Sequence, residues 1–305
     1  MDQAAVLRRI KGKGKGNSPM GKLNPGLDGI ACRISDEQIR VVSITSGKGG
    51  VGKTHIAANL AYIFSRMGKK TLVLDADMGL ANIDVILGLA PRFNLHHVLA
   101  GEKRLEEILV RGPGDIMILP SASGIQEMAN LSTGQKLTLL DELNGMHRGF
   151  DFVLIDTAAG IAGNVMYFNM AAKEIIVVVS PEPTSLTDAY ALIKLLYQGH
   201  GEKRIMVLVN MARNPGEARQ VYSKLSKAAE HFLDLSIEYL GYVLYDEKVP
   251  EAVKRQRVLA EIYPSCQASR CLLTIAEKMN HEQPANYNYG SLKFFSKATV
   301  DRERG

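Results

Sequence analysis

The stretch "VVSITSGKGGVGKTHIAANLA", residues 41–61, decides the fold, because it joins a β-branched run, a glycine-rich loop and an amphipathic helical pattern. Residues Gly47 to Thr54 match G-x-x-x-x-G-K-[ST], the pattern of a loop whose backbone N–H groups surround phosphate oxygens. The N-terminus of the following helix adds a partial positive charge. We expect Lys53 to neutralise the β- and γ-phosphates, and Thr54 to offer its hydroxyl to Mg²⁺.

This loop contains a second lysine, Lys48, which the phosphate-binding pattern does not require. Lysines in loops are usually solvated surface residues, and that is the simpler reading of Lys48. A glycine-rich turn that happens to contain lysines is the alternative for the whole loop. The preceding apolar run and the following helical pattern argue against that alternative.

The order of apolar segments predicts an α/β fold, a three-layer P-loop NTPase architecture with a mainly parallel, twisted sheet covered by helices on both faces. The first helix after the loop carries apolar residues at helical spacing and ends near Gly68. Its apolar positions are Ile56, Leu60, Ile63, Phe64 and Met67. Short β-branched runs that read as buried strands occur at residues 39–45, 70–77, 115–122, 152–158, 174–180 and 204–210.

Charge and composition divide the 305 residues into a body and two ends. Residues 1–24 account for the whole formal net charge of +5 and read as a flexible arm, so the rest of the chain is net neutral. We expect an arm at residues 1–39, an ATPase domain at 40–280, and a linker with a further helix at 281–305. The three cysteines form no C-x-x-C pair, and no run of 18 apolar residues predicts a membrane span.

Acidic residues follow two of the predicted strands. Asp75 and Asp77 end the run "VLDAD", and Asp156 ends the run "FVLID". Because the carboxyl ends of parallel strands meet at one edge of a sheet, these carboxylates should lie beside the lysine-bearing loop. Carboxylates at that edge are suited to hold the water shell of Mg²⁺.

The motif K-G-G-x-G-K-[ST], Lys48 to Thr54, resembles the deviant Walker A motif of the MinD/ParA class of ATPases. The resemblance implies a homodimer formed with ATP, in which Lys48 contacts the phosphates bound by the partner, as an arginine finger does. It also implies that Asp75 and Asp156 order the magnesium water shell and that Asp77 polarises the attacking water. The residues that would bind the nucleotide are Gly47, Lys48, Gly49, Gly50, Val51, Gly52, Lys53, Thr54, His55 and Asn210.

Two of these assignments rest on single residues. Asn210 follows a late strand, where the class places an asparagine against the adenine edge, although asparagine at a strand end can also cap a turn. His55 departs from the class, since many of its members have Thr or Ser there. It could contact the α-phosphate or simply begin the helix.

The segments "DADMGLANIDVILGL", "DTAAGI" and "SPEPTSLTDAYALIKLL" resemble the FlhG (FleN) family of MinD-like regulators of flagellar number. The opening "DQAAVLR" is similar to that family's N-terminal element, which implies that Asp2, Gln3 and Arg8 contact and stimulate an FlhF-type GTPase. The resemblance also implies three other partners. These are an enhancer-binding activator of flagellar genes, a flagellar C-ring component, and the inner membrane surface.

The C-terminal segment "GSLKFFSKATVDR" predicts a short amphipathic helix that places Leu292, Phe294 and Phe295 against a membrane. One such helix is a weak anchor, and dimerisation would supply a second copy. The same phenylalanines could instead pack on the body in the absence of nucleotide. We therefore expect a cytoplasmic protein that associates with the membrane, at the flagellated pole, when ATP is bound.

Three other functions were weighed against this one. An iron–sulfur carrier would need a paired cysteine motif, and a metabolic ATP-dependent enzyme would need an acceptor pocket, for which the sequence offers no residues. A ParA-like DNA-partitioning ATPase is the alternative that stays open, because basic residues gather in one region. They are Arg213, Arg219, Lys224 and Lys227, and acidic residues lie between them. Direct nucleic-acid binding is the weaker expectation because the body is net neutral.

Overall fold

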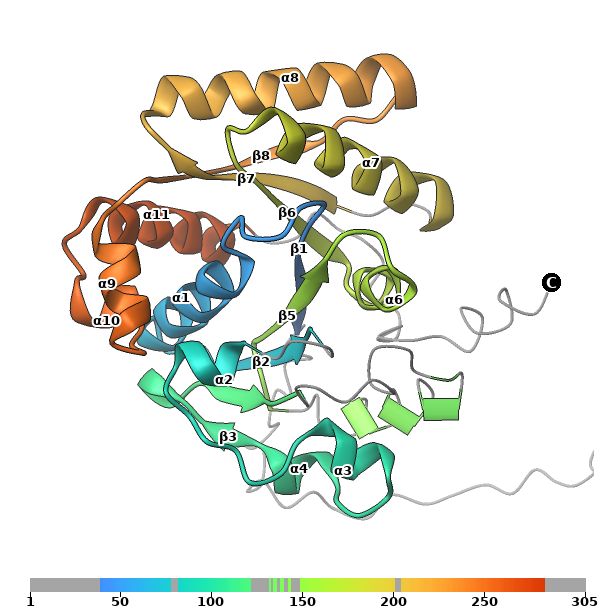
Figure 1. The fold of residues 1–305 in the computed structure, drawn as a ribbon, viewed down its shortest axis with the longest axis vertical. Helices are drawn as coiled ribbons and strands as arrows, with labels where there is room; N and C mark the ends of the chain where they lie inside the picture. Colours follow the sequence, from blue (N-terminus) through green and yellow to red (C-terminus); the bar gives the residue numbers. More distant parts are fainter. Residues whose placement is uncertain are drawn as a thin grey trace, which may run out of the picture. The chain divides into compact units, whose positions relative to one another are not determined.

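In the computed structural model, the chain forms an eight-stranded sheet with helices on both faces (Figure 1). The structure describes residues 39–77, 82–121, 149–200 and 204–282, together with scattered positions between 132 and 143. The strand order is β3-β4-β2-β5-β1-β6-β7-β8, and every neighbouring pair is parallel except β3 with β4. The strands are β1 (Arg40–Ser46), β2 (Thr71–Ala76), β3 (Val110–Arg111), β4 (Met117–Leu119), β5 (Phe152–Ala159), β6 (Glu174–Val179), β7 (Arg204–Ala212) and β8 (Glu238–Leu244).

The described helices divide into groups by the face of the sheet that they cover. The group with α1, α2 and α9–α11 buries one face, and the group with α3, α4 and α6–α8 buries the other. Their bounds are α1 (Lys53–Arg66), α2 (Ile83–Ile86), α3 (Leu95–Leu99), α4 (Leu105–Ile108), α6 (Gly163–Ala171), α7 (Pro183–His200), α8 (Pro215–Leu233), α9 (Lys248–Lys254), α10 (Leu259–Ile262) and α11 (Gln267–His281), with the 3₁₀ turn η1 at Pro113–Asp115.

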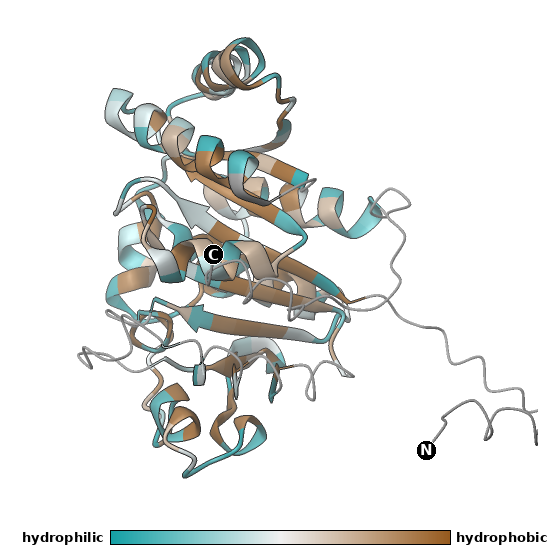
Figure 2. Ribbon diagram, turned by 90° about the vertical axis from the view of Figure 1, so that its right-hand side faces the viewer, coloured by the Kyte–Doolittle hydropathy of each residue, from teal (hydrophilic) through white to brown (hydrophobic). Residues whose placement is uncertain are grey.

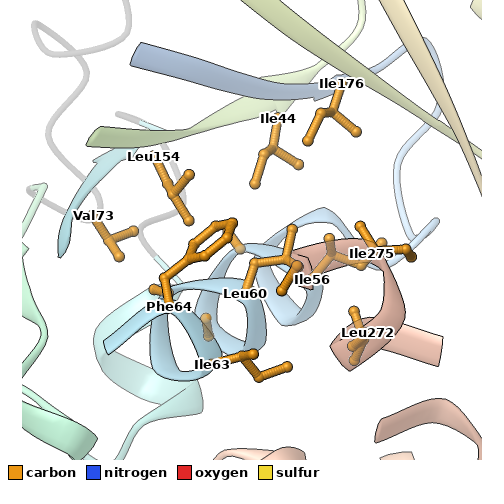
Figure 3. Packing of buried hydrophobic residues seen from close by; sticks show 14 of the residues in the cluster. Ile44, Ile56, Leu60, Ile63, Phe64, Val73, Leu154, Ile176, Leu272 and Ile275 are labelled. Atoms are coloured by element: carbon orange, nitrogen blue, oxygen red, sulfur yellow. The ribbon is translucent and has the colours of Figure 1, made fainter. Parts of the chain in front are cut away.

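Helix α1 occupies the centre of its layer because nearly its whole length is apolar where it faces the sheet (Figure 3). The Phe64 ring stacks on Phe152 of β5, with ring centroids 4.1 Å apart. Alternate residues of β1 point to opposite faces, so Ile44 packs toward α1 while Ser43 reaches Asn169 of α6. Burial on both faces makes the central strands hydrophobic along their length, as Figure 2 shows. The sheet therefore holds the ends of β1, β2 and β5 in fixed positions.

A network of ion pairs lies at the N-terminal ends of the central strands. Arg40, which begins β1, donates to the Glu174 carboxylate of β6 at 2.6 and 2.8 Å. Arg204, which begins β7, binds Glu174, Glu238 and Glu282. The nucleotide-binding pattern follows the other end of β1, so the two charged regions occupy opposite ends of the sheet.

The structure confirms the predicted fold class and the six predicted strands, with one strand shortened. The run 115–122 forms only the three residues of β4, because η1 precedes it. Two strands, β3 and β8, were not predicted. Helix α1 ends as expected, with Met67 at the cap and Gly68 next to it at a φ of 81°.

The predicted terminal contacts lie outside the described residues. They are Asp2, Gln3 and Arg8 at one end and Leu292, Phe294 and Phe295 at the other. Among the helices that the structure describes, none is long and apolar enough to cross a bilayer.

Candidate nucleotide site

The glycine-rich loop between β1 and α1 has the backbone form of a phosphate-binding loop. Gly50 and Gly52 adopt φ angles of 77° and 90°, which L side chains rarely adopt. The first hydrogen bond of α1 runs from the Ile56 N–H to the Gly52 carbonyl, at 3.0 Å. The N–H groups of residues 53–55 therefore precede the helical ladder and are available to an anion.

The start of this loop packs tightly on α7. A Cβ atom added to Gly47 would come within 2.2 Å of the backbone carbonyl carbon of Asp188. Only glycine fits this position without moving α7. The close approach also brings the first residues of α7 beside Lys48.

Lys53 is the buried cation of the site. Its Nζ donates to the Ser46 hydroxyl at 3.0 Å, and that hydroxyl donates to the Lys48 carbonyl at 2.6 Å. Burial lowers the pKa of Lys53, while the nearby carboxylates of Asp156 and Asp77 act in the opposite direction. Ser46 was missed by sequence reasoning, and its place at the end of an apolar strand, next to the motif, was the available signal.

Asp75 and Asp156 lie toward the carboxyl ends of the neighbouring strands β2 and β5, and both are about 1 % exposed. They stand opposite each other in the register of β2 and β5. Burial raises the pKa of Asp156 to about 7, although the Thr54 hydroxyl and the Lys53 ammonium favour its charged form. The pKa of Asp75 is also raised, first by burial and then by the charge of Asp156. Two buried carboxylates side by side indicate a place where a cation binds.

These groups fit Mg²⁺. The Thr54 hydroxyl and the Asp156 carboxylate already contact each other, and the Oδ1 atom of Asp156 is buried without a hydrogen-bond partner among the described residues. Mg²⁺ is usually held by one or two protein oxygens, several waters and the phosphates of the substrate. Thr54 would bind such an ion directly, and Asp156 would bind its water shell.

Asp75 holds the segment that carries Asp77. One of its carboxylate oxygens accepts the Asp77 N–H at 3.1 Å, and the other accepts the N–H groups of Asn82 and Ile83 at 3.1 and 3.3 Å. These bonds clamp both ends of the segment between β2 and α2. Asp75 therefore holds the backbone of Asp77 next to the carboxyl end of β2.

Lys48 lies at the surface of the site and contacts the start of α7. Its ammonium forms an ion pair with Glu182 and a 3.0 Å hydrogen bond with the Thr184 hydroxyl. Its side chain is 36 % exposed, whereas Lys53 is buried. The two lysines of one loop therefore lie in different environments.

Asn210 lies near the carboxyl end of β7 and beside the loop. Its amide nitrogen donates to the Val51 carbonyl at 2.8 Å, and an added Cβ at Gly52 would come within 2.5 Å of the same nitrogen. The next residue, Met211, has a φ of 60°, an uncommon backbone conformation for a residue with a side chain. Within the part of the chain that the structure describes, the side-chain oxygen of Asn210 has no hydrogen bond to the protein, so it could accept one from a ligand.

Comparison with known proteins identifies the family of this domain. The CobQ/CobB/MinD/ParA nucleotide binding domain family matches residues 42–259. The chain is 44 % identical over 263 residues to antiactivator FleN of Pseudomonas aeruginosa, covering 86 % of this chain and 94 % of that protein. It is 35 % identical to the flagellum site-determining protein YlxH of Helicobacter pylori, covering 78 % and 80 % of the two chains.

A solved structure of similar fold is the septum site-determining protein MinD of Pyrococcus horikoshii in complex with Mg-ADP. It superposes with a TM-score of 0.67 at 26 % identity, covering 80 % of this chain and 97 % of that one. The fold agrees with that of this relative. The chain therefore belongs to the CobQ/CobB/MinD/ParA family of nucleotide-binding domains, and it is an ATPase of the MinD type.

Proposed function

We propose that this protein is an ATP-driven dimerisation switch that regulates flagellar number and placement. Its cofactors are ATP and Mg²⁺. The names of the relatives, an antiactivator and a flagellum site-determining protein, support the flagellar role. The observation that carries the switch is the position of Lys48, whose ammonium lies outside the Ser46–Lys53 cluster and faces Glu182.

In this proposal Lys48 acts on the nucleotide bound by a second copy of the chain. An exposed ion pair contributes about 0–1 kcal/mol, so Lys48 can leave Glu182 at small cost when a dimer forms. In the dimer its charge would stabilise the transferred phosphoryl group, and Asp77 would position the attacking water. ATP hydrolysis is then conditional on dimerisation, and its rate sets the lifetime of the dimer.

The remaining parts of the chain have proposed roles of their own. Residues 40–280 form the ATPase domain, and the arm at residues 1–39 engages an FlhF-type GTPase through Asp2, Gln3 and Arg8. Residues 281–305 carry the membrane-targeting helix with Phe294 and Phe295. A flagellar gene activator and a C-ring component are the other proposed partners, and the relative named antiactivator supports the first of them.

A DNA-partitioning role is the second candidate, because Arg213, Arg219, Lys224 and Lys227 are exposed in or beside α8. Acidic side chains interrupt this surface. Glu217 accepts the Arg213 N–H at 2.7 Å, and Glu230 and Asp234 are exposed near the end of the helix. A surface of mixed charge is a poor match to a phosphate backbone.

The test is size-exclusion chromatography with light scattering, under ADP and under ATP with Mg²⁺, followed by sedimentation with liposomes. The switch predicts a monomer with ADP and a dimer with ATP, and it predicts that liposomes retain only the dimer. One mass under both nucleotides would refute the switch. Steeply salt-dependent binding to random duplex DNA, with no binding to lipid, would favour partitioning instead.

A further inference from the structure

Ser46 joins three parts of the nucleotide site through its hydrogen bonds. It is the last residue of β1, and it is fully buried. Its hydroxyl lies 3.0 Å from the Lys53 Nζ atom and 2.6 Å from the Lys48 carbonyl oxygen. Its own carbonyl accepts the Gly160 N–H at 2.8 Å, from the loop that follows β5. Ser46 therefore connects the phosphate-binding loop to the strand that carries Asp156.

The hydrogen bonds of the Ser46 hydroxyl can run in one direction only. An ammonium group can only donate, and a carbonyl can only accept. The hydroxyl therefore accepts from Lys53 and gives its single proton to the Lys48 carbonyl. Hydrogen bonds from a charged donor are stronger than neutral ones, and in a buried chain each bond polarises the next. The charge of Lys53 thus directs the proton of Ser46 toward Lys48.

The geometry of β1 explains why this hydroxyl reaches α1. Alternate residues of a strand point to opposite faces, so Ser46 lies on the same face as Ile44, which packs toward α1. At this point a step of two residues in β1 lies opposite a step of three in β5. The extra residue is in β5, so β1 keeps its alternation. The Ser46 side chain therefore faces Lys53, the first residue of α1.

The bond from Ser46 holds Lys48 where the packing of the loop ends. On one side of Lys48, Gly47 lies against the backbone of α7. On the other side, Gly49 is exposed, and a Cβ atom added to it would meet nothing within 4 Å. The backbone of Lys48 is therefore fixed by Gly47 and by the Ser46 hydroxyl. Its side chain can leave Glu182 for another partner while the backbone stays in place.

We propose that Ser46 is a positioning residue for ATP hydrolysis, which holds the backbone of Lys48 so that its ammonium is directed at the nucleotide of a second copy. This inference rests on the proposed function, in which Lys48 acts across a dimer. Ser46 is then needed in the copy that donates Lys48, and not in the copy that holds the reacting nucleotide. In the latter copy the phosphates themselves accept from Lys53, so that ammonium keeps its partners without Ser46.

The experiment places Ser46→Ala in one copy of a mixed dimer at a time. The reference pair is Lys48→Ala with Asp77→Ala, in which the complete site belongs to the Lys48→Ala copy and receives Lys48 from the other copy. Adding Ser46→Ala to the Asp77→Ala copy should lower turnover about tenfold, the effect of one lost hydrogen bond. Adding it to the Lys48→Ala copy should lower turnover by no more than about twofold.

The design separates positioning from stability. Both arrangements contain the same three substitutions, so a general loss of stability would lower both equally. Ser46→Thr in the donating copy keeps the hydroxyl and should restore most of the turnover. The matched control is Ser43→Ala, because Ser43 is a buried serine of the same strand whose hydroxyl bonds to Asn169 on the other face. Ser43→Ala should affect the two arrangements equally.

Three results would overturn the proposal. Equal losses in the two arrangements would make Ser46 a residue that serves the fold alone. A loss confined to the arrangement with Ser46→Ala in the Lys48→Ala copy would show that Ser46 acts through Lys53 in its own site. Full turnover in both arrangements would show that the hydroxyl is dispensable.

Failure of the proposed function is recognised separately. The reference pair contains no change at Ser46, so a reference pair that forms mixed dimers and stays inactive would refute action across the dimer. The positioning of Lys48 is then tested in the natural chain, where Ser46→Ala should lower kcat about tenfold and leave KM unchanged. A raised KM with an unchanged kcat would show that Ser46 serves nucleotide binding instead.

Discussion

The buried charged side chains at the two ends of the sheet differ in whether they have partners. At the N-terminal ends of the strands, Glu174 is bound by Arg40 and Arg204, and Arg204 is bound by two further carboxylates. At the C-terminal ends, Asp156 keeps an unpartnered oxygen and the raised pKa that burial causes. The satisfied network stabilises the fold. Among the described residues, Oδ1 of Asp156 and Nδ1 of His55 are buried without a hydrogen-bond partner, and both lie beside the phosphate-binding loop.

The largest expected effect is on turnover, at the nucleotide end. Lys48→Ala should lower the rate of ATP hydrolysis by about 10³-fold or more, because the dimer loses the cation that stabilises the transferred phosphoryl group. ADP binding to the monomer should stay unchanged, since Lys53 and the backbone N–H groups of the loop remain. A single-turnover assay with calorimetry checks both. Turnover within a few-fold of the natural chain would make Lys48 an ordinary loop residue.

Removing the ion-pair network at the N-terminal ends of the strands should lower stability and leave catalysis unchanged. Glu174→Ala leaves two arginines without their shared carboxylate, and we expect a loss of about 3–5 kcal/mol in the free energy of unfolding. Urea denaturation measures it. The matched control is Arg257→Ala, which removes the exposed pair with Glu261 and should leave the midpoint nearly unchanged. Equal effects of the two substitutions would contradict the distinction between buried and exposed pairs.

The pKa of Asp156 predicts a dependence of stability on pH. Because the folded-state pKa is about 7, well above its ordinary value of 3.8, the folded chain holds a proton that the unfolded chain releases. Stability without nucleotide should therefore fall as the pH rises from about 4 through 7, by up to about 1.4 kcal/mol per pH unit. Asp75, whose pKa is also raised, contributes with the same sign.

His55 acts in the opposite direction. Burial lowers its pKa from 6.5 to about 4, so its contribution to stability is lost as the pH falls through that range. The effect of Asp156 is therefore measured as the difference between the natural chain and Asp156→Asn, by thermal unfolding across pH. As the pH rises, Asp156→Asn should become more stable relative to the natural chain. A difference that does not depend on pH would show that Asp156 is ionised in the folded chain.

The smallest effect is expected at Glu182. Glu182→Gln removes the ion pair that holds Lys48 in the single chain, and we expect it to favour ATP-driven dimerisation by no more than about fivefold. Light scattering across a range of protein concentrations measures the change, with Glu247→Gln as an exposed control. A loss of dimerisation would mean that Glu182 contacts the partner in the dimer.

The sequence was most informative where a motif and the spacing of apolar residues predicted the same structure. Gly47 to Thr54 and the apolar spacing of α1 together predicted the loop, the helix and the position of Lys53, and the run "FVLID" predicted the position of Asp156 in β5. Strand β8 was missed because Glu238, Gly241 and two tyrosines interrupt its apolar pattern, as befits an edge strand that is only partly buried. Strand β3, with two residues, is too short to have a period.

The partners of the site residues could not be predicted from the sequence, because they come from distant segments. Glu182 reaches Lys48 only because Gly47 lets α7 pack against the loop. Ala260 is 201 residues from Asn59, and its N–H orients the Asn59 amide, whose nitrogen lies beside His55. Such contacts depend on how whole helices pack and not on the spacing within one motif.

The most direct test of action by Lys48 across a dimer is to mix two inactive variants, Lys48→Ala and Asp77→Ala. In a mixed dimer, the site of the Lys48→Ala copy keeps its own Asp77 and receives Lys48 from its partner. Random pairing in equal amounts should then restore about a quarter of the natural turnover, one working site in half of the dimers. A mixture that forms mixed dimers with ATP yet stays inactive would show that both residues must come from one copy.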